Sequence, residues 1–259
     1  MTLVWKSGYS FDSDASTYID AVETADGQAL ETGVRVAIND FVLGCKQDGI
    51  WNAIKASCIL AGARTLTGAL VPLVGGAPTN NNFVSADYDR ETGLVGDGST
   101  KYLDSNRASN SDPQNSRHAS VYVSTKTGNG PFLGAFRAGP VYTWIGPGNS
   151  LSSDVYVLNS TSFVVVPRST SLGFYGLSRT SSTNLSYRIG SSTTAVSNSS
   201  AATDSATTEI FRIDRTAASF SIVYGASRLS FYSIGESLDL ALLDTRVSNL
   251  MTAIGAAIP

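Results

Sequence analysis

The sequence is poor in charged side chains. They make up 15% of its 259 residues, against about 25% in an average soluble domain. The net charge is −3, and the 18 lysines and arginines are scattered. Nucleic-acid affinity depends on clustered basic side chains, so the composition argues against DNA and RNA as partners. The shortage of charge also indicates that part of the surface contacts protein rather than water.

Long apolar runs and metal-binding side chains are also scarce. No run of 18 apolar residues occurs, and the N-terminus has no secretory pattern, so we expect neither a membrane span nor export. Cys45, Cys58 and His118 are too few for a structural zinc site, and we expect no metal and no cofactor. On a helical hairpin the two cysteines would lie too far apart for a disulfide, so we expect two free, buried thiols.

Catalytic side chains are equally rare. Any imidazole base would have to be His118, for which we expect a structural role. Glycosidases need two carboxylates in one cleft. Glu209 and Asp214 belong to one strand region but are five residues apart, which places them on opposite faces of a regular strand. The sequence therefore predicts no catalytic residues and no enzymatic activity.

The N-terminal part has the apolar spacing of helices. A short apolar stripe falls within residues 17–26, and residues 30–45 repeat apolar side chains at steps of three and four. Residues 50–61 continue this spacing after a turn at Asp48-Gly49, which predicts a helical hairpin over the two longer segments. Two helices cannot bury an apolar side alone, so the hairpin must pack on the β domain or on another chain.

Beyond residue 80 the apolar period falls to two. Short segments rich in β-branched and aromatic residues alternate with turn residues, which is typical of an antiparallel sandwich. These segments are 100–104, 118–124, 131–136, 141–145, 154–158, 162–166, 172–177, 185–189, 208–213, 219–224 and 229–234. Residues 190–206 predict a solvated loop or edge hairpin, and residues 240–254 a C-terminal helix. We assign residues 1–81 to an assembly segment of arm, hairpin and linker, and 82–259 to the sandwich.

Aromatic side chains provide the one ligand signal. Tyr142 and Trp144 alternate along one predicted strand, and Tyr175 lies on another. Exposed rings on a sheet stack on sugars, whereas rings inside a sandwich fill the core. Both interpretations are open from the sequence alone.

Three segments carry a family resemblance: VRVAINDFVLGCKQDGIW (34–51), TGLVGDGSTKYLDSN (92–106) and SFYSIGESL (230–238). They resemble structural proteins of tailed bacteriophages that contain a concanavalin A-like lectin/glucanase domain. In that superfamily a Gly-Asp-Gly turn with a following Tyr-Leu strand opens the sandwich, and an Ile-Gly-x-x-Leu step closes it. The resemblance implies a mainly β jelly-roll fold. The catalytic acids and lectin metal ligands of the family have no matching motif in this chain.

The resemblance and the low charge together predict a non-enzymatic component of a phage virion, such as a tail, fibre or capsid-decorating protein. We expect it to be made in the host cytoplasm and to contact copies of itself and other virion proteins. We assign to this interface the aromatic residues of the N-terminal half, Trp5, Tyr9, Phe11, Phe41 and Trp51. The alternative function is a lectin-like module that recognises a host surface glycan through the rings at positions 142, 144 and 175.

Overall fold

Two antiparallel sheets and a layer of helices make up the computed structural model, which describes residues 11–136, 141–148, 152–203 and 205–259. Its α-helices are α1 (Ser13–Asp26), α2 (Thr32–Gln47), α3 (Leu66–Ala69) and α4 (Leu240–Ala257). Short 3-10 helices are η1 (Trp51–Ala53), η2 (Ser85–Asp87), η3 (Ser109–Ser111) and η4 (Thr216–Ala218). None of these helices is both long enough and apolar enough to span a membrane.

The strands form two large sheets and a small ribbon. Sheet A contains β1 (Ile54–Ile59), β3 (Tyr88–Asp89), β4 (Gly93–Val95), β6 (Arg117–Thr125), β11 (Gly173–Arg179), β12 (Asn184–Ile189), β13 (Ser192–Ser197) and β17 (Arg228–Gly235). Sheet B contains β2 (Thr79–Asn81), β5 (Tyr102–Ala108), β7 (Leu133–Phe136), β8 (Tyr142–Pro147), β9 (Ser153–Ser160), β10 (Val164–Pro167) and β14 (Thr207–Ile210). The ribbon pairs β15 (Arg212–Ile213) with β16 (Val223–Tyr224).

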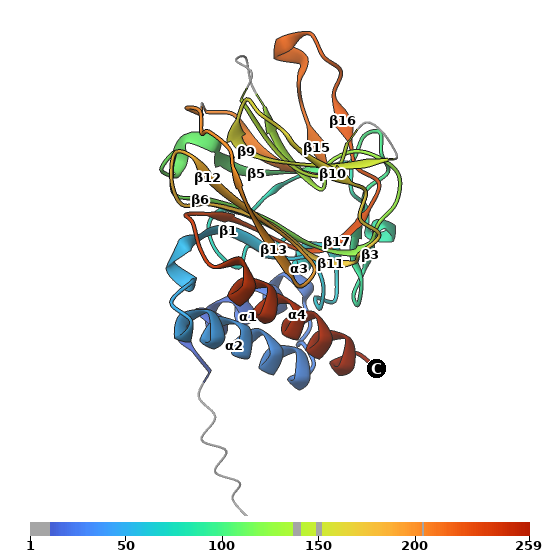
Figure 1. The fold of residues 1–259 in the computed structure, drawn as a ribbon. Coiled ribbons are helices and arrows are strands. Elements are labelled where there is room, and N and C mark those ends of the chain that lie inside the picture. Colours follow the sequence, from blue (N-terminus) through green and yellow to red (C-terminus); the bar gives the residue numbers. More distant parts are fainter. Residues whose placement is uncertain (1–10, 137–140, 149–151, 204) are drawn as a thin grey trace, which may run out of the picture.

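The sheets pack face to face as a sandwich (Figure 1). Sheet A has the order β13-β12-β11-β6-β17-β4-β3, with β1 also paired to β17, and sheet B has the order β10-β9-β8-β7-β14-β5-β2. The main core lies between them, because alternate residues of β6, β17, β5 and β14 point into it. The predicted mainly β sandwich with a C-terminal helix is therefore confirmed.

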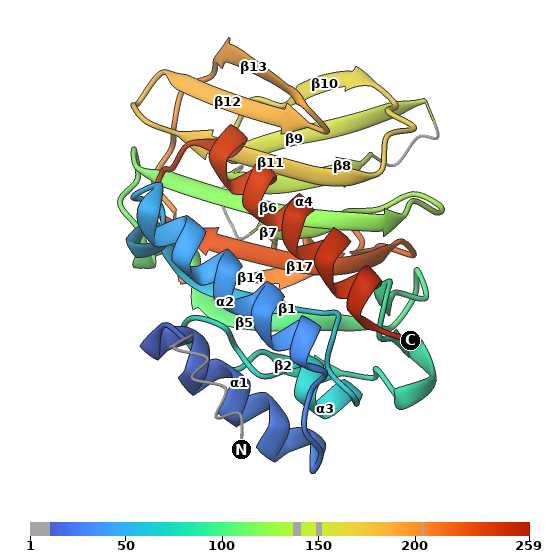
Figure 2. The ribbon, with the colours of Figure 1, turned by 90° about the horizontal axis from the view of Figure 1, so that it is seen from below.

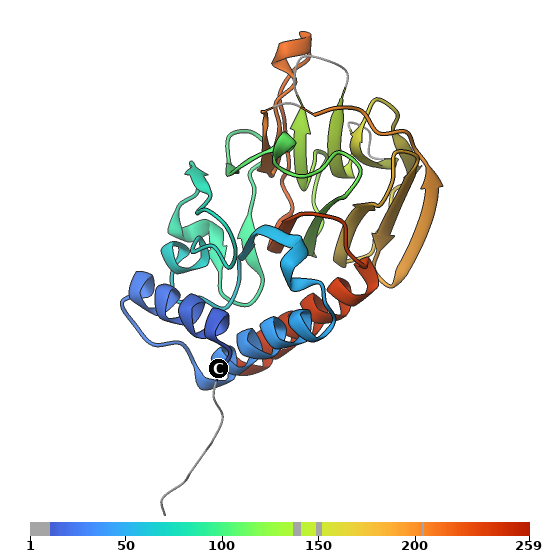
Figure 3. The same cartoon turned by 90° about the vertical axis from the view of Figure 1, so that its left-hand side faces the viewer.

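The helices cover the outer face of sheet A. Figures 2 and 3 show α2 and α4 alongside each other over this sheet, with α1 beside them. Their apolar side chains share one buried cluster with Phe231 of β17 and Phe174 of β11. The apolar side of the N-terminal helices is thus buried within the same chain, which is the first of the two solutions that the sequence left open.

The prediction of a second helix in the hairpin, over residues 50–61, is wrong. Residues 54–59 form β1, which pairs antiparallel with β17, and the helical pair of the N-terminal part is α1 with α2. Both faces of β1 are buried, with Ile54 and Ile59 against the helices and Ala56 against the sandwich core. A strand that is apolar on both faces loses the period of two and can match a helical spacing over a short stretch. The part of the chain before residue 82 thus contributes β1 to sheet A and β2 to sheet B.

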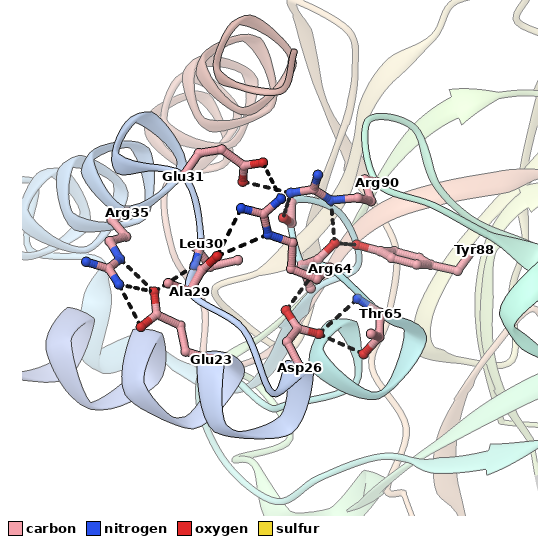
Figure 4. A network of polar contacts seen from close by, with 12 residues as sticks. Glu23, Asp26, Ala29, Leu30, Glu31, Arg35, Arg64, Thr65, Tyr88 and Arg90 are labelled. Carbon is pink, nitrogen blue, oxygen red and sulfur yellow. Dashed lines mark hydrogen bonds and ion pairs between the residues drawn. The ribbon is translucent and has the colours of Figure 1, made fainter.

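Ion pairs fasten the connection between α1 and α2 to the sandwich (Figure 4). Glu31 lies 2.7 Å from both Arg64 and Arg90, which belong to the segments that follow β1 and β3. Asp26 accepts hydrogen bonds from the backbone amides of Arg64 and Thr65. Because these carboxylates are partly buried and multiply bonded, the helix layer has a defined position on the sheet.

The two cysteines are free and buried, as predicted from the sequence. Cys45 lies on α2 and Cys58 on β1, so they sit on different elements rather than on two arms of a helical hairpin. The Sγ of Cys58 is 3.4 Å from the hydroxyl of Tyr232. Burial raises the pKa of each thiol to about 12.

These thiols are expected to be unreactive in the folded protein, because at neutral pH each is protonated and shielded from solvent. Titration with a thiol reagent should find no rapidly reacting group in the native chain. It should find two per chain after denaturation without reductant. Fewer than two in the denatured sample would contradict the free-thiol assignment.

Candidate functional site

The candidate site lies on the outer face of sheet B, the face that points away from sheet A. Glu209 of β14 is directly opposite Asp104 of β5, and the next pair along is Ile210 with Leu103. Ile210 and Leu103 belong to the inter-sheet core. Since successive side chains of a strand point to opposite faces, Glu209 and Asp104 both point outward.

Glu209 and Asp214 lie on the same side of the sheet, and the sequence-based expectation of opposite faces is wrong. The chain turns sharply at Phe211, which has a φ of +69° and separates β14 from β15. A left-handed residue interrupts the alternation of a strand, so counting by twos fails across this position. Phe211 is held there by hydrogen bonds to the backbone of Phe132 and Gly225.

Gly134 of β7 allows the chain after Phe211 to lie close over the sheet. This glycine is paired with Glu209, and a Cβ atom at its position would lie 2.7 Å from the Cβ of Ile213. Any larger residue would push β15 away from β7. The β15–β16 ribbon can therefore cover a small apolar cluster on this face that includes Phe136 and Trp144.

Arg212 joins the two carboxylates. Its Nη2 donates to Asp214 Oδ2 at 2.5 Å, and its Nε lies 3.4 Å from Glu209 Oε2, an ion-pair contact without hydrogen-bond geometry. The guanidinium stacks over the ring of Tyr102 at 4.1 Å and lies 5.7 Å from that of Tyr224. Both rings attract the cation by cation–π interaction, so the position of Arg212 is well defined.

The two carboxyl groups differ in their electrostatics. Burial raises the pKa of Glu209 to about 7, because it outweighs the attraction of Arg212, and the negative charges of Asp104 and Asp214 act in the same direction as burial. Burial also acts to raise the pKa of Asp214, but hydrogen bonds from Thr216 and the charge of Arg212 lower it below its usual value. Glu209 therefore titrates near neutral pH while Asp214 stays ionised.

A cleft of about 440 Å³ opens beside these carboxyl groups. Its lining residues are Phe136, Ser205, Ala206, Thr207, Glu209, Asp214, Thr216 and Ala217. The wall thus combines two carboxyl groups and three hydroxyl groups with one aromatic ring. Within the described residues no group of three His, Cys, Asp or Glu side chains could hold a metal ion.

The rings proposed for sugar stacking are separated and buried. Tyr142 and Trp144 lie in the apolar cluster on the outer face of sheet B, with exposed fractions of 9% and 3%. Tyr175 is fully buried between the sheets, where its ring packs against Phe132. A stacking residue needs an exposed ring face, which these three rings lack. Phe136, which sequence reasoning missed, is the aromatic residue that lines the cleft, but it is 7% exposed and presents only an edge of apolar surface there.

The residues expected at an assembly interface have different positions. Trp5 and Tyr9 fall outside the described residues. Phe41 is buried under the helix layer, and Phe11 and Trp51 pack against the same cluster. These three side chains pack within their own chain. They therefore do not need a partner protein to cover them.

His118 has the structural role that we expected. It is fully buried on β6, with Nδ1 at 2.6 Å from the backbone oxygen of Glu236 and Nε2 at 2.8 Å from Ser233 Oγ. Because a carbonyl only accepts, Nδ1 carries the proton and Nε2 accepts from the serine. The imidazole is fully engaged and lies on sheet A, away from the cleft.

The cleft residues gave only a weak signal in the sequence. The run Glu209 to Asp214 reads as one continuous strand, and phenylalanine is an unusual residue for a left-handed conformation. Thr207, Thr216 and Ser205 are ordinary in a chain this rich in serine and threonine. The signal that was present is the combination of two acids and an arginine within six residues.

No protein-family model and no curated protein matches this sequence. Several solved structures are similar to parts of this chain at low identity. One is domain 4 of AbnA, a GH43 extracellular arabinanase from Geobacillus stearothermophilus in complex with arabinotriose, with a TM-score of 0.43 and 7% identity over 67% of this chain and 82% of that one. Another is a mutant Trypanosoma rangeli sialidase that displays trans-sialidase activity, with a TM-score of 0.49 and 11% identity over 84% of this chain and 39% of that one.

The receptor-binding domain of botulinum neurotoxin C/D mosaic serotype is also similar, with a TM-score of 0.48 and 10% identity over 76% of this chain and 51% of that one. This chain thus spans about half or less of the sialidase and the toxin domain. At these scores and identities the likenesses do not extend to a ligand or an activity. The fold defines the chain as a two-sheet antiparallel β-sandwich protein with a helix layer over one sheet.

Proposed function

We propose that this chain binds a carbohydrate in the cleft on the outer face of sheet B and does not convert it. The observation that carries the proposal is the grouping of Glu209 and Asp214 in one cleft with hydroxyl side chains and an aromatic ring. Sugar hydroxyls donate and accept hydrogen bonds, and an ionised carboxylate is the stronger acceptor for them. The two acids disfavour an anionic sugar, so the proposed ligand is neutral.

The hydrogen bonds of Asp214 support binding without turnover. Its Oδ2 accepts from Arg212, and its Oδ1 accepts from both the amide and the hydroxyl of Thr216. A catalytic nucleophile or base must direct a lone pair at the substrate. These bonds occupy three of the roughly four acceptor positions of the carboxylate and fix its orientation, so Asp214 is suited to a fixed electrostatic role with one position left for a sugar hydroxyl.

Replacing Glu209 with glutamine is expected to weaken binding only where the wild-type residue is ionised. A glycan array with neutral and acidic oligosaccharides would identify a neutral probe, and calorimetric titration of that probe would measure affinity. At about pH 8.5 we expect a loss of roughly 10- to 100-fold, the effect of removing one charged hydrogen bond. At about pH 5.5 the two proteins should bind alike, because Glu209, with its pKa near 7, is then protonated and resembles glutamine.

The matched control is Glu91→Gln, which removes an exposed carboxylate in the turn between β3 and β4. It should leave the affinity unchanged at both pH values. An equal loss in this variant, or no neutral glycan bound by the wild type, would contradict the site. The proposed absence of turnover would be contradicted if the wild type released shorter sugars from the probe and Glu209→Gln did not.

We further propose that the chain performs this binding in a phage virion. The low charge content and the three phage-like segments support that setting. The N-terminal helices do not, because their apolar side is occupied within the chain. Antibody labelling of purified phage particles in the electron microscope tests this, and particles that lack the chain would contradict it.

A further inference from the structure

Strand β10 forms one free edge of sheet B, and its outward side chains are apolar. Val165 is 61% exposed, and Phe163, directly before the strand, is 44% exposed. The stretch from Thr161 to Pro167 has no charged side chain. Proteins commonly protect a sheet edge with charges, prolines, bulges or a covering segment, and of these β10 has only Pro167, at its end, so the stretch before it is open to pairing.

The direction of the edge backbone groups follows from the pairing with β9. The register runs without a bulge from Val164 opposite Tyr156 to Pro167 opposite Ser153, and the next amide, that of Arg168, donates to the oxygen of Ser152. Hydrogen-bonded and non-bonded pairs alternate in an antiparallel ladder. Residues 164, 166 and 168 therefore bond to β9, while residues 163 and 165 direct their N–H and C=O groups to the free edge.

The geometry points to a second copy of this chain as the occupant of the β10 edge, with the two strands antiparallel and a two-fold axis at Val164. Phe163 then lies opposite Val165 of the other copy, and the reverse pair is its symmetry mate. Each pair exchanges two backbone hydrogen bonds, since both residues have outward donors and acceptors. The register brings no charged residue opposite another, because the edge stretch contains none.

The side chains fit the same register. Phe163 and Val165 are two residues apart, so they share a face of the sheet, and the contact of Phe163 with the ring of Tyr142 at 4.7 Å identifies it as the outer face. Pairing about Val164 places each exposed ring beside the exposed valine of the other copy. Pro167, which has no amide, lies opposite Thr161, beyond the pairs that exchange hydrogen bonds.

Strand β13 of sheet A forms a second free edge, at the same end of the sandwich as β10 (Figure 2). It is less suited to pairing with a second copy. Its sequence is Ser-Thr-Thr-Ala-Val-Ser, and most of its side chains are small, polar and exposed. Pairing there would remove little apolar surface from water. Of these two edges, β10 therefore offers the larger apolar contact.

This dimer has a consequence that rests on the proposed function. The two-fold axis runs perpendicular to sheet B, so the outer faces of the two copies point the same way. The two clefts then lie on one side of a continuous sheet, separated by the strands from β10 to β14 in each copy. Two sites with one orientation bind a surface that displays many glycans more strongly than one site does.

Sedimentation of the full chain over a concentration series tests the dimer. The wild type is expected to approach twice its chain mass of 27.1 kDa. Val165→Pro removes an outward amide that β9 does not use, and Val165→Lys places a charge on the edge. Each should raise the dissociation constant at least about tenfold. Val84→Lys changes a valine of similar exposure, 56%, away from this edge and should have no effect.

A wild type that stays monomeric up to its solubility limit would overturn the proposal. So would a dimer that persists unchanged in both Val165 variants, or one that Val84→Lys disrupts equally. Binding of the neutral oligosaccharide in solution is read separately, because one cleft suffices for it. If both proposals hold, the monomeric Val165→Pro variant should bind the oligosaccharide in solution as the wild type does. It should bind a glycan-coated surface more weakly.

Discussion

Replacing Arg179 with methionine is expected to destabilise the protein by about 3–5 kcal/mol, because each buried acceptor left without a donor costs about 1–3 kcal/mol. Arg179 is fully buried at the end of β11. Its guanidinium donates to the backbone oxygens of Leu158, Asn198 and Ser181 and to the side-chain oxygens of Asn159 and Asn198. Methionine fills much of the space but donates nothing, so several buried acceptors lose their partner.

The arginine also determines local structure. Asn159, at the end of β9, has a φ of +40°, and its side-chain oxygen accepts a hydrogen bond from Arg179. Asn198, whose side-chain oxygen also accepts from Arg179, belongs to the segment after β13. One guanidinium thus ties the ends of strands from both sheets. Urea denaturation of the full chain measures the effect, and hydrogen exchange should show lost protection around residues 158 and 198.

Arg35→Met is the matched control for this substitution. Arg35 pairs with Glu23 at 2.6 Å, but its side chain is 35% exposed. Solvent reaches this partly exposed ion pair and screens it, so we expect a loss of about 1 kcal/mol. A similar loss in both variants would mean that the buried hydrogen bonds of Arg179 contribute no more than its bulk.

His118 is expected to make the fold sensitive to acid. Burial lowers its pKa from 6.5 to about 4, because a charge there would be desolvated and a proton on Nε2 would oppose the hydrogen bond from Ser233. Between pH 6.5 and pH 4 the unfolded chain therefore binds more protons than the folded chain, and stability falls as the pH falls. The full effect of this one group is about 3 kcal/mol.

Glu209 acts in the opposite direction over an overlapping range. Its pKa is about 7 in the fold and 4.5 as a free side chain, so the folded state binds more protons in between and gains stability as the pH falls. We therefore place the test in a Glu209→Gln background. Urea denaturation at several pH values should show a steeper acid loss in this variant than in the wild type, and the added His118→Gln change should remove it. An unchanged slope after His118→Gln would contradict the assignment.

Sequence periodicity located most of the sandwich. Residues 118–124 and 229–234 were predicted as strands and lie within β6 and β17, and residues 240–254 were predicted as a helix and lie within α4. The two strands are rich in β-branched and aromatic residues, and α4 follows the helical period over many residues. Such patterns are local, so the sequence displays them without reference to the rest of the chain.

Two elements show where local pattern fails. Strand β1 was predicted as a helix because it is buried on both faces, and its apolar spacing carries no period of two. The strand over 208–213 was predicted as continuous, but it breaks at Phe211, whose conformation depends on hydrogen bonds to Phe132 and Gly225. Those partners are distant in sequence, so no short window reports them.

The sequence by itself therefore determined the β-sandwich class, the C-terminal helix and the free cysteines, because periodicity and composition record whether a side chain is buried. Only the tertiary structure decided what buries it. The helices could have covered a neighbouring protein but cover sheet A, and the rings at positions 142 and 175 could have stood at the surface but lie in two separate clusters. Glu209 and Asp214 share a cleft because one residue between them adopts a left-handed conformation, which depends on contacts across the fold.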